Sequence, residues 1–268
     1  MPAWHRIAAL GRIIFLDGLR RHALVGLVLL SLAAEASGFL FMDFFGRDVG
    51  RASSDFLFSV MWSGGLLFLF FHAVQVISWD EERKVIYTIL SRPLSRAEYV
   101  LGVFTGLLAL LIGLQLLLGA AGYATLLLIK HSLATIYFQH LSLAHYLLTW
   151  AGLAAMQAAL LAVIMLFSGM VRGGFPVLLL SVAYYGICSG LPVVRDSIDA
   201  HYSAAGYLLQ ILTALFPDFS RLDFKDMVVS SLPVTNGMQV WINFGLVLLY
   251  IGIVTGLASR IYARRDLQ

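Results

Sequence analysis

The sequence predicts an all-α integral membrane protein with six transmembrane helices, formed by residues 1–268 as a single transmembrane domain. Hydrophobic residues make up 60% of the chain and charged residues 12%, whereas a soluble globular domain carries about 25% charged residues. Six apolar runs reach the length of about 20 residues that a helix needs to cross a bilayer. With so few charged residues to form a polar surface, most of the surface must face lipid.

The six predicted spans are separated by short polar segments. They cover residues 23–45, 56–78, 99–129, 143–171, 174–194 and 238–262. An even number of crossings places both termini on the same side of the membrane. We expect no cleaved signal peptide, because the first long apolar run begins only near Ala23, after an arginine-rich stretch.

The basic residues predict which side is cytoplasmic. One side holds twelve of them: Arg6, Arg12, Arg20, Arg21, Arg83, Lys84, Arg92, Arg96, Arg172, Arg260, Arg264 and Arg265. The other side holds six: Arg47, Arg51, Lys130, Arg195, Arg221 and Lys225. The side richer in Lys and Arg is the cytoplasmic one. We therefore expect a multi-pass protein of the inner (plasma) membrane with both termini cytoplasmic.

Composition argues against several other classes. The net charge of +3 is not concentrated in a tail, so nucleic-acid binding is not expected. The single cysteine, Cys188, excludes an internal disulfide and a multi-cysteine metal site. Four histidines map to the outer side without the spacing of a compact metal site, so we expect no metal: His131, His140, His145 and His201.

Polar and small residues inside the spans predict contacts within the protein. An ionised carboxylate at Glu35, near the middle of the first span, would be costly, so Glu35 should face the interior or water. It is either a neutral structural residue or part of a translocation path. Hydrogen bonds between helices are expected for His72, Gln75, Gln115, Gln157 and Asn243. Close packing within one subunit is expected at Gly102 and Gly106, Gly252 and Gly256, and Ala154, Ala158 and Ala162.

Two further segments are predicted outside the spans. Residues 1–22 alternate basic and apolar residues at helical spacing, which indicates an in-plane amphipathic helix on the inner leaflet. Residues 195–237 are too long for a plain turn. Within them, 204–216 is apolar but too short to cross comfortably, so we expect a re-entrant or interfacial segment on the outer side.

The segment between the second and third spans carries an unusual density of charge. Residues 79–92 are predicted to form a cytoplasmic amphipathic helix, and Pro93 ends it. Its apolar face would comprise Val85, Ile86, Ile89 and Leu90, and its polar face Lys84, Thr88 and Arg92. Ser78, with Glu81 three residues later, fits a capping box at its start.

A second capping box, Ser95 with Glu98, opens the third span. Two capping boxes indicate a rigid, oriented element. Two interpretations stay open for helix 79–92. It lies on the membrane surface with its apolar face down, or its charged face docks on a cytoplasmic partner. The capping favours docking but does not name the partner.

The stretch DEERKVIYTILSRPLSRAEYVLGVFTG, residues 80–106, resembles the segment of type-2 exporter-class ABC-transporter permeases that carries the coupling helix. In that family a break of the form S-R-P-hydrophobic-S-R precedes Y-V-L-G-K. Here the break reads SRPLSRAEYVLG, with Val103 where a lysine is common. The subgroup most similar to it contains the permease of the nitrous-oxide reductase maturation system. FLDGLRRHALV at 15–25 and ALFPDFSRLDF at 214–224 are more weakly similar.

This resemblance implies a permease that works as a homodimer or heterodimer with two separate cytoplasmic ABC ATPase subunits. The coupling helix would sit in a groove of the ATPase and transmit its closure to the spans. Carried over to this chain, the polar contacts would come from Asp80, Glu81, Glu82, Arg83 and Lys84. The packing contacts would come from Val85, Ile86, Ile89 and Leu90, with Arg92 and Pro93 closing the segment.

The residues themselves also indicate that ATP is hydrolysed by another chain. The motif G-x-x-x-x-G-K-[ST] does not occur, because none of the three lysines follows a glycine. ATP and Mg would be bound by the partner ATPase, and we expect no cofactor on this chain. No nucleophile–base pair indicates an enzyme. The alternative function is a non-transporting membrane scaffold or signalling subunit that docks a cytoplasmic partner.

Overall fold

The computed structural model describes residues 3–41, 49–82, 95–132, 138, 141–197, 216–229 and 237–264. Six helical stretches in these ranges are long and apolar enough to cross a membrane: His22–Leu40, Val49–Ser78, Arg96–Ser132, Leu143–Met170, Gly174–Val194 and Gly237–Arg264. The predicted all-α fold with six candidate membrane spans is thus confirmed. The second span begins at Val49, seven residues before the predicted boundary at 56.

The helices follow one another along the chain with few other elements between them. The α-helices are α1 (Ala3–Arg20), α2 (His22–Phe41), α3 (Val49–Leu67), α4 (Val74–Glu82), α6 (Arg96–Ser132), α7 (Leu143–Met170), α8 (Gly174–Ser197) and α10 (Gly237–Arg264). A π-helical stretch, η2 (Phe68–Ala73), joins α3 to α4, so the three form one continuous helix. Two short 3₁₀ helices precede α10: η4 (Phe219–Leu222) and η5 (Lys225–Met227).

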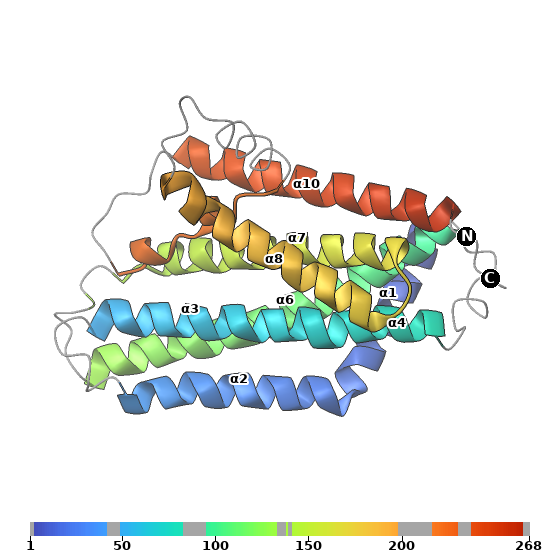
Figure 1. The fold of residues 1–268 in the computed structure, drawn as a ribbon. Helices are drawn as coiled ribbons and strands as arrows, with labels where there is room; N and C mark the ends of the chain where they lie inside the picture. The colour runs from blue at the N-terminus through green and yellow to red at the C-terminus, as the bar shows by residue number, and fades with distance from the viewer. Residues whose placement is uncertain are drawn as a thin grey trace, which may run out of the picture.

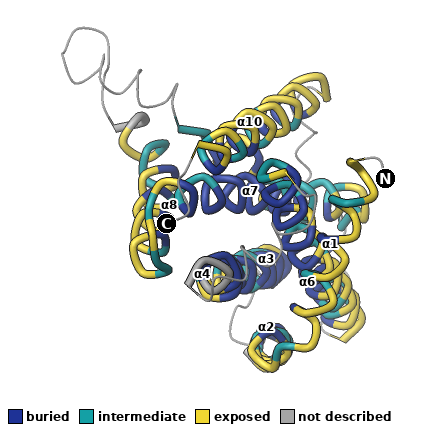
Figure 2. The backbone as a smooth tube through the Cα atoms, turned by 90° about the vertical axis from the view of Figure 1, so that its right-hand side faces the viewer, coloured by how far each residue is buried: buried dark blue, intermediate teal, exposed yellow. Residues whose placement is uncertain are grey.

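The long helices run side by side, and both chain ends lie at the same end of the bundle (Figure 1). We call this the terminal end. The opposite, far end holds η4 and η5. Viewed along the bundle, α7 consists largely of buried residues, whereas α2, α8 and α10 carry continuous exposed faces (Figure 2). These exposed faces hold large apolar side chains such as Leu40, Phe175 and Trp241, as a surface in contact with lipid requires.

Small residues set how closely the helices approach. On α7, Ala154, Ala158 and Ala162 are buried, as predicted. Gly102 and Gly106 of α6 are also confirmed as packing positions, because α1 presses against both of them. The same prediction is wrong for Gly252 and Gly256 of α10. A Cβ at either position would meet nothing within 4 Å, because this side of α10 faces outward.

The predicted N-terminal helix is present as α1, and its inner face packs onto α6. Arg6 contacts Glu98, and Leu10 lies against Gly102. Further along, Gly18 lies against Leu110. Each step of four residues along α1 therefore matches a step of four along α6, which is ridge-into-groove packing of i±4 rows. The orientation of α1 relative to the membrane plane stays a prediction.

A tight turn joins α7 to α8. Gly173 has a φ of +91°, a left-handed conformation that glycine adopts without steric cost. The turn brings the start of α8 close to α4, where a Cβ at Gly174 would lie 3.1 Å from Ser78 Oγ. Residues 216–229 form the described part of the predicted outer loop. The predicted re-entrant stretch at 204–216 lies outside the described residues except for Phe216.

Candidate functional site

The predicted coupling segment begins on a helix that continues the second span. The backbone of Asp80, Glu81 and Glu82 is helical as the last residues of α4. The remaining predicted contact residues lie outside the described residues: Arg83, Lys84, Val85, Ile86, Ile89, Leu90, Arg92 and Pro93. The acidic start of the segment is therefore attached to α3–η2–α4 without a break.

The predicted capping box at Ser78 is wrong. Ser78 lies inside α4 rather than at a helix start, and its side chain is buried against Gly174 of α8. A capping serine is needed only where backbone N–H groups lack intrahelical partners. Because the helix runs through this position, the serine serves as a small packing residue instead.

The second capping box is confirmed and is larger than predicted. Ser95 Oγ accepts from the Glu98 N–H at 3.2 Å, and Glu98 Oε2 accepts from the Ser95 N–H at 2.9 Å. The other carboxylate oxygen of Glu98 accepts from Arg6 Nη2 of α1 at 2.5 Å. One carboxylate thus fixes the start of α6 and joins it to α1.

The start of α6 is also tied to the end of α10. Arg96 Nη1 donates to the carbonyl oxygens of Tyr262 and Ala263 at 3.3 and 3.2 Å, where the last carbonyls of a helix lack intrahelical donors. The Tyr262 hydroxyl lies 2.8 Å from Ser168 Oγ of α7. At the terminal end, polar contacts therefore connect α1, α6, α7 and α10.

Glu35 of α2 faces the protein interior, as predicted. Its side chain is 1% exposed, and neither carboxylate oxygen has a hydrogen-bond partner among the described residues. Its Oε1 lies 3.7 Å from the position of a Cβ on Gly122, and the Tyr146 hydroxyl lies 3.0 Å from the same point. A residue larger than glycine at 122 would press on both side chains. Glu35 therefore occupies a space that Gly122 provides between α2, α6 and α7.

Two buried glutamines connect three helices near the middle of the bundle, which confirms their predicted interhelical hydrogen bonds. Gln115 Nε2 donates to the Met61 carbonyl at 3.1 Å and to Gln157 Oε1 at 2.7 Å. Gln157 Nε2 donates to the Trp62 carbonyl at 3.3 Å. The amides of α6 and α7 therefore hold α3 in register about two turns before the π-helical stretch.

His72 and Gln75 differ from the prediction. Neither ring nitrogen of His72 has a hydrogen-bond partner among the described residues. The ring stacks on Phe68 with a centroid distance of 5.2 Å. Gln75 is exposed and lines a shallow apolar groove between α2 and η2. Asn243 does form a bond between elements, from its Nδ2 to the Arg221 carbonyl at 3.1 Å.

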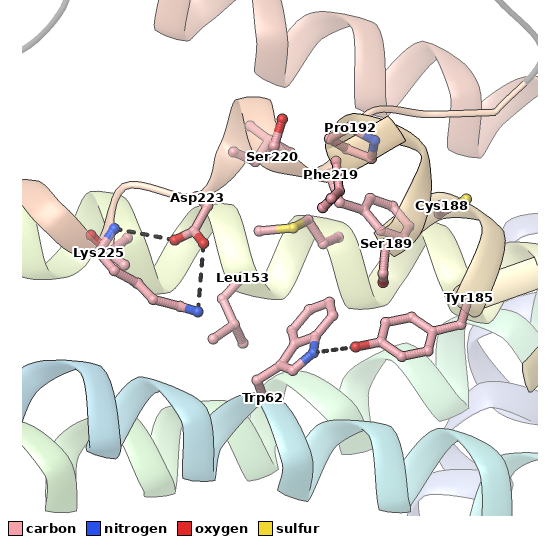
Figure 3. A pocket seen from close by; sticks show the side chains of 14 residues that line it. Trp62, Leu153, Tyr185, Cys188, Ser189, Pro192, Phe219, Ser220, Asp223 and Lys225 are labelled. Carbon is pink, nitrogen blue, oxygen red and sulfur yellow. Dashed lines mark hydrogen bonds and ion pairs between the residues drawn. The ribbon is translucent and has the colours of Figure 1, made fainter. Parts of the chain in front are cut away.

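A cavity of about 280 Å³ lies between α3, α7, α8 and the segment that carries η4 (Figure 3). We call it the α3–α7–α8 cavity. Trp62 forms one wall, and its Nε1 donates to the Tyr185 hydroxyl of α8 at 2.9 Å. Leu153 and Met156 of α7 and Phe219 of η4 supply further apolar walls. The lining thus comes from four segments that are far apart in the sequence.

Charged residues gather where this cavity meets the far end. Asp223 Oδ2 lies 3.5 Å from Lys225 Nζ, and both side chains line the cavity. Nearby on α3, Arg51 pairs with Asp226 at 2.6 Å and more loosely with Asp55 at 3.9 Å. These contacts hold the segment 216–229 onto the start of α3.

The far-end segment is also fixed by contacts with α7. Thr149 Oγ1 donates to the Phe224 carbonyl at 3.1 Å, and the Leu222 carbonyl packs directly over Gly152. No motif in the sequence predicts the α3–α7–α8 cavity. Its residues carry no spacing motif, and the only available signal was a set of polar residues within apolar runs, such as Trp62, Tyr185 and Ser189.

No cluster of metal ligands is found in the described part of the chain, where no three His, Cys, Asp or Glu residues are arranged to hold an ion. Cys188 is a buried free thiol. No family model matches the sequence, and no curated protein matches it either.

Proposed function

We propose that this chain is the membrane-spanning subunit of an ABC transporter and that separate cytoplasmic ATPase subunits supply the energy. The main support for the proposal is that the charged segment, residues 83–94, is flanked in the sequence by two helices of the bundle, α4 and α6. On one side α4 extends the second span as helix to Glu82. On the other, Ser95 and Glu98 cap the start of α6. A force applied to the segment would reach two spanning helices directly.

The contacts of the α6 start support the same function. Glu98 is bonded to α1 through Arg6, and Arg96 is bonded to the end of α10. A displacement of this point would therefore be shared by α1, α6 and α10. Packed helices move as discrete bodies rather than deforming continuously, so a partner that closes on ATP would shift whole helices. In this mechanism two copies of such a subunit, identical or different, enclose the path in the plasma membrane.

Inside the bundle, two features support transport of a substrate. Glu35 places an acidic group in the interior, where ionisable residues commonly mark transport paths. Trp62 of α3 forms one wall of the α3–α7–α8 cavity. Gln115 of α6 donates a hydrogen bond to the carbonyl oxygen of Met61, the residue that precedes Trp62 in α3. Movement of α6 would thus act on the helix that forms a cavity wall.

The test begins with purification of the tagged chain from its native membrane in mild detergent. We expect a stoichiometric partner that carries a P-loop and stimulates ATP-dependent uptake or release in reconstituted vesicles. Recovery of a different cytoplasmic protein, without ATP-dependent movement of any substrate, would favour the scaffold function instead.

The interface is tested by reversing two charges, Glu82→Lys together with Arg83→Glu. We expect the double variant to lose the ATPase during purification, because polar contacts of the docking surface would be inverted. Lys130→Glu, a charge reversal at the opposite end of α6, should retain the ATPase. Retention of the ATPase and of its coupling in the double variant would contradict the proposed interface.

A further inference from the structure

We propose that the α3–α7–α8 cavity binds an amphipathic organic cation, a molecule with an aromatic or aliphatic body and one ammonium group. This deepens the proposed function, because the bound molecule would be the substrate of the transporter. The binding itself is a property of this chain alone, so it can be tested without the ATPase.

The volume of the cavity suits a small organic molecule. Each water molecule takes about 30 Å³ of liquid volume, so a cavity of about 280 Å³ has room for on the order of ten waters. Ligand sites in proteins start at about 300 Å³. A compact molecule with one or two rings matches this size, whereas a lipid with two acyl chains does not.

The wall composition determines the body of the ligand. Trp62 and Tyr185 meet with ring centroids 5.9 Å apart, and their hydrogen bond holds both rings in place. Leu153, Met156 and Phe219 complete a mainly apolar surface. Aromatic faces attract a positive charge as well as an apolar group, and the thioether of a methionine adapts to different shapes.

The charges around the cavity determine which head group the ligand should carry. Two charged residues line the cavity, Asp223 and Lys225. Among the described residues, five more lie beside them at the start of α3 and on the segment 216–229: Arg51, Asp55, Asp218, Arg221 and Asp226. Asp55 is within electrostatic range of Arg51, Asp223, Lys225 and Asp226. Four carboxylates against three cations leave one net negative charge. A cleft with apolar walls focuses such a field and concentrates counter-ions, so a cation is favoured over an anion.

The position of Asp223 explains how one molecule would contact both the apolar walls and the negative charge. Its carboxylate lies at the edge of the apolar walls (Figure 3) and contacts Lys225 twice. One of these contacts is from the backbone N–H, at 3.2 Å to Oδ1, and it would hold the carboxylate in place while a ligand is bound. The ammonium group of the ligand would approach Asp223 while its body lies against Trp62.

The experiment measures equilibrium binding of tritiated naphthylethylamine to the purified full chain in nanodiscs of neutral phospholipid, with empty nanodiscs subtracted. Naphthylethanol and naphthylacetate serve as competitors with the same ring system but a neutral or anionic head. We expect saturable binding that naphthylethanol displaces weakly and naphthylacetate more weakly still. Equal or tighter binding of naphthylacetate would overturn the proposal.

Variants locate the binding to this cavity. Asp223→Asn should weaken binding about tenfold, the effect of losing a hydrogen bond to a charged group. Lys225→Met should not weaken it, because removing the competing cation leaves Asp223 free for the ligand. Ser189→Phe, which adds a ring at the exposed edge of the cavity, should abolish binding. Asp17→Asn on α1, at the terminal end, is the matched control and should bind as the unaltered chain does.

Each variant is first compared with the unaltered chain by gel filtration and thermal unfolding, so that a loss of binding is assigned only to folded protein. Unchanged binding in both Asp223→Asn and Ser189→Phe would overturn the site, even if an ATPase co-purifies with the chain. If binding follows the expected pattern but no ATPase partner is found, the binding site is supported and the proposed transporter function is contradicted.

Discussion

At the scale of single residues, Gly65 is a position where one added methyl group should have a large effect. A Cβ there would overlap the buried side-chain amide of Gln157, which also bonds to Gln115. We expect Gly65→Ala to lower the free energy of unfolding by about 1–3 kcal/mol, the usual effect of overpacking a core. Thermal unfolding of the purified chain in detergent measures this effect.

The control is the same substitution on an open face. A Cβ at Gly113 of α6 meets nothing within 4 Å, so Gly113→Ala should be neutral or should raise the free energy of unfolding by up to about 1 kcal/mol, because alanine is the better helix former. Equal destabilisation by both substitutions would mean that the contact between Gly65 and Gln157 does not form.

Individual residues also show how far the sequence predicts the site. The cost of a charge in lipid was enough to predict that Glu35 faces the interior. It could not predict the space that Gly122 leaves beside Glu35 and Tyr146, since that depends on which helix faces meet. Likewise, the interhelical bonds of Gln115 and Gln157 were predicted, but their carbonyl partners at Met61 and Trp62 require the relative register of three helices.

At the scale of helices, the two predicted capping boxes provide a direct comparison. Ser95 caps α6 through its hydroxyl, so Ser95→Ala should lower the free energy of unfolding by about 1 kcal/mol. Ser78 lies within α4 and its hydroxyl has no hydrogen-bond partner among the described residues, so Ser78→Ala should have little effect. Thermal unfolding of the two variants side by side tests this difference, and a larger effect at Ser78 would contradict the continuous helix.

The comparison also explains why one of these boxes was predicted wrongly. Both have a serine followed by a glutamate three residues later, and nothing local distinguishes them. The difference is tertiary, because Gly174 of α8 packs on Ser78, whereas Arg6 of α1 reaches Glu98 and completes the second box. The spans themselves were predicted well, since apolar length alone determines them. The start of α3 at Val49 was not predicted, because the charged residues Arg51 and Asp55 interrupt the apolar run. In the structure Arg51 pairs with Asp55 and with Asp226, and the sequence alone does not show these contacts.

At the scale of the whole molecule, cysteine labelling can test which end of the bundle faces the cytoplasm. The chain has only one cysteine of its own, so a cysteine introduced at either end gives a distinct signal. The only cysteine, Cys188, is 1% exposed, so the unaltered chain should react little with a membrane-impermeant maleimide. Trp4 at the terminal end is 80% exposed, and Ser220 at the far end is also exposed. Cysteines placed at these two positions therefore report opposite ends of the bundle.

In intact cells we expect Ser220→Cys to react with the maleimide and Trp4→Cys to react only after the membrane is opened. The physical reason is the excess of basic residues at the terminal end, which favours the cytoplasmic side. This orientation is also required by the proposed function, because the end of α4 and the start of α6, which flank residues 83–94 in the sequence, lie at the same end of the bundle as the termini, and ATP is available only in the cytoplasm. Labelling of Trp4→Cys in intact cells would place that segment outside. No cytoplasmic ATPase could then act on it, whereas binding of a cation in the α3–α7–α8 cavity would be unaffected.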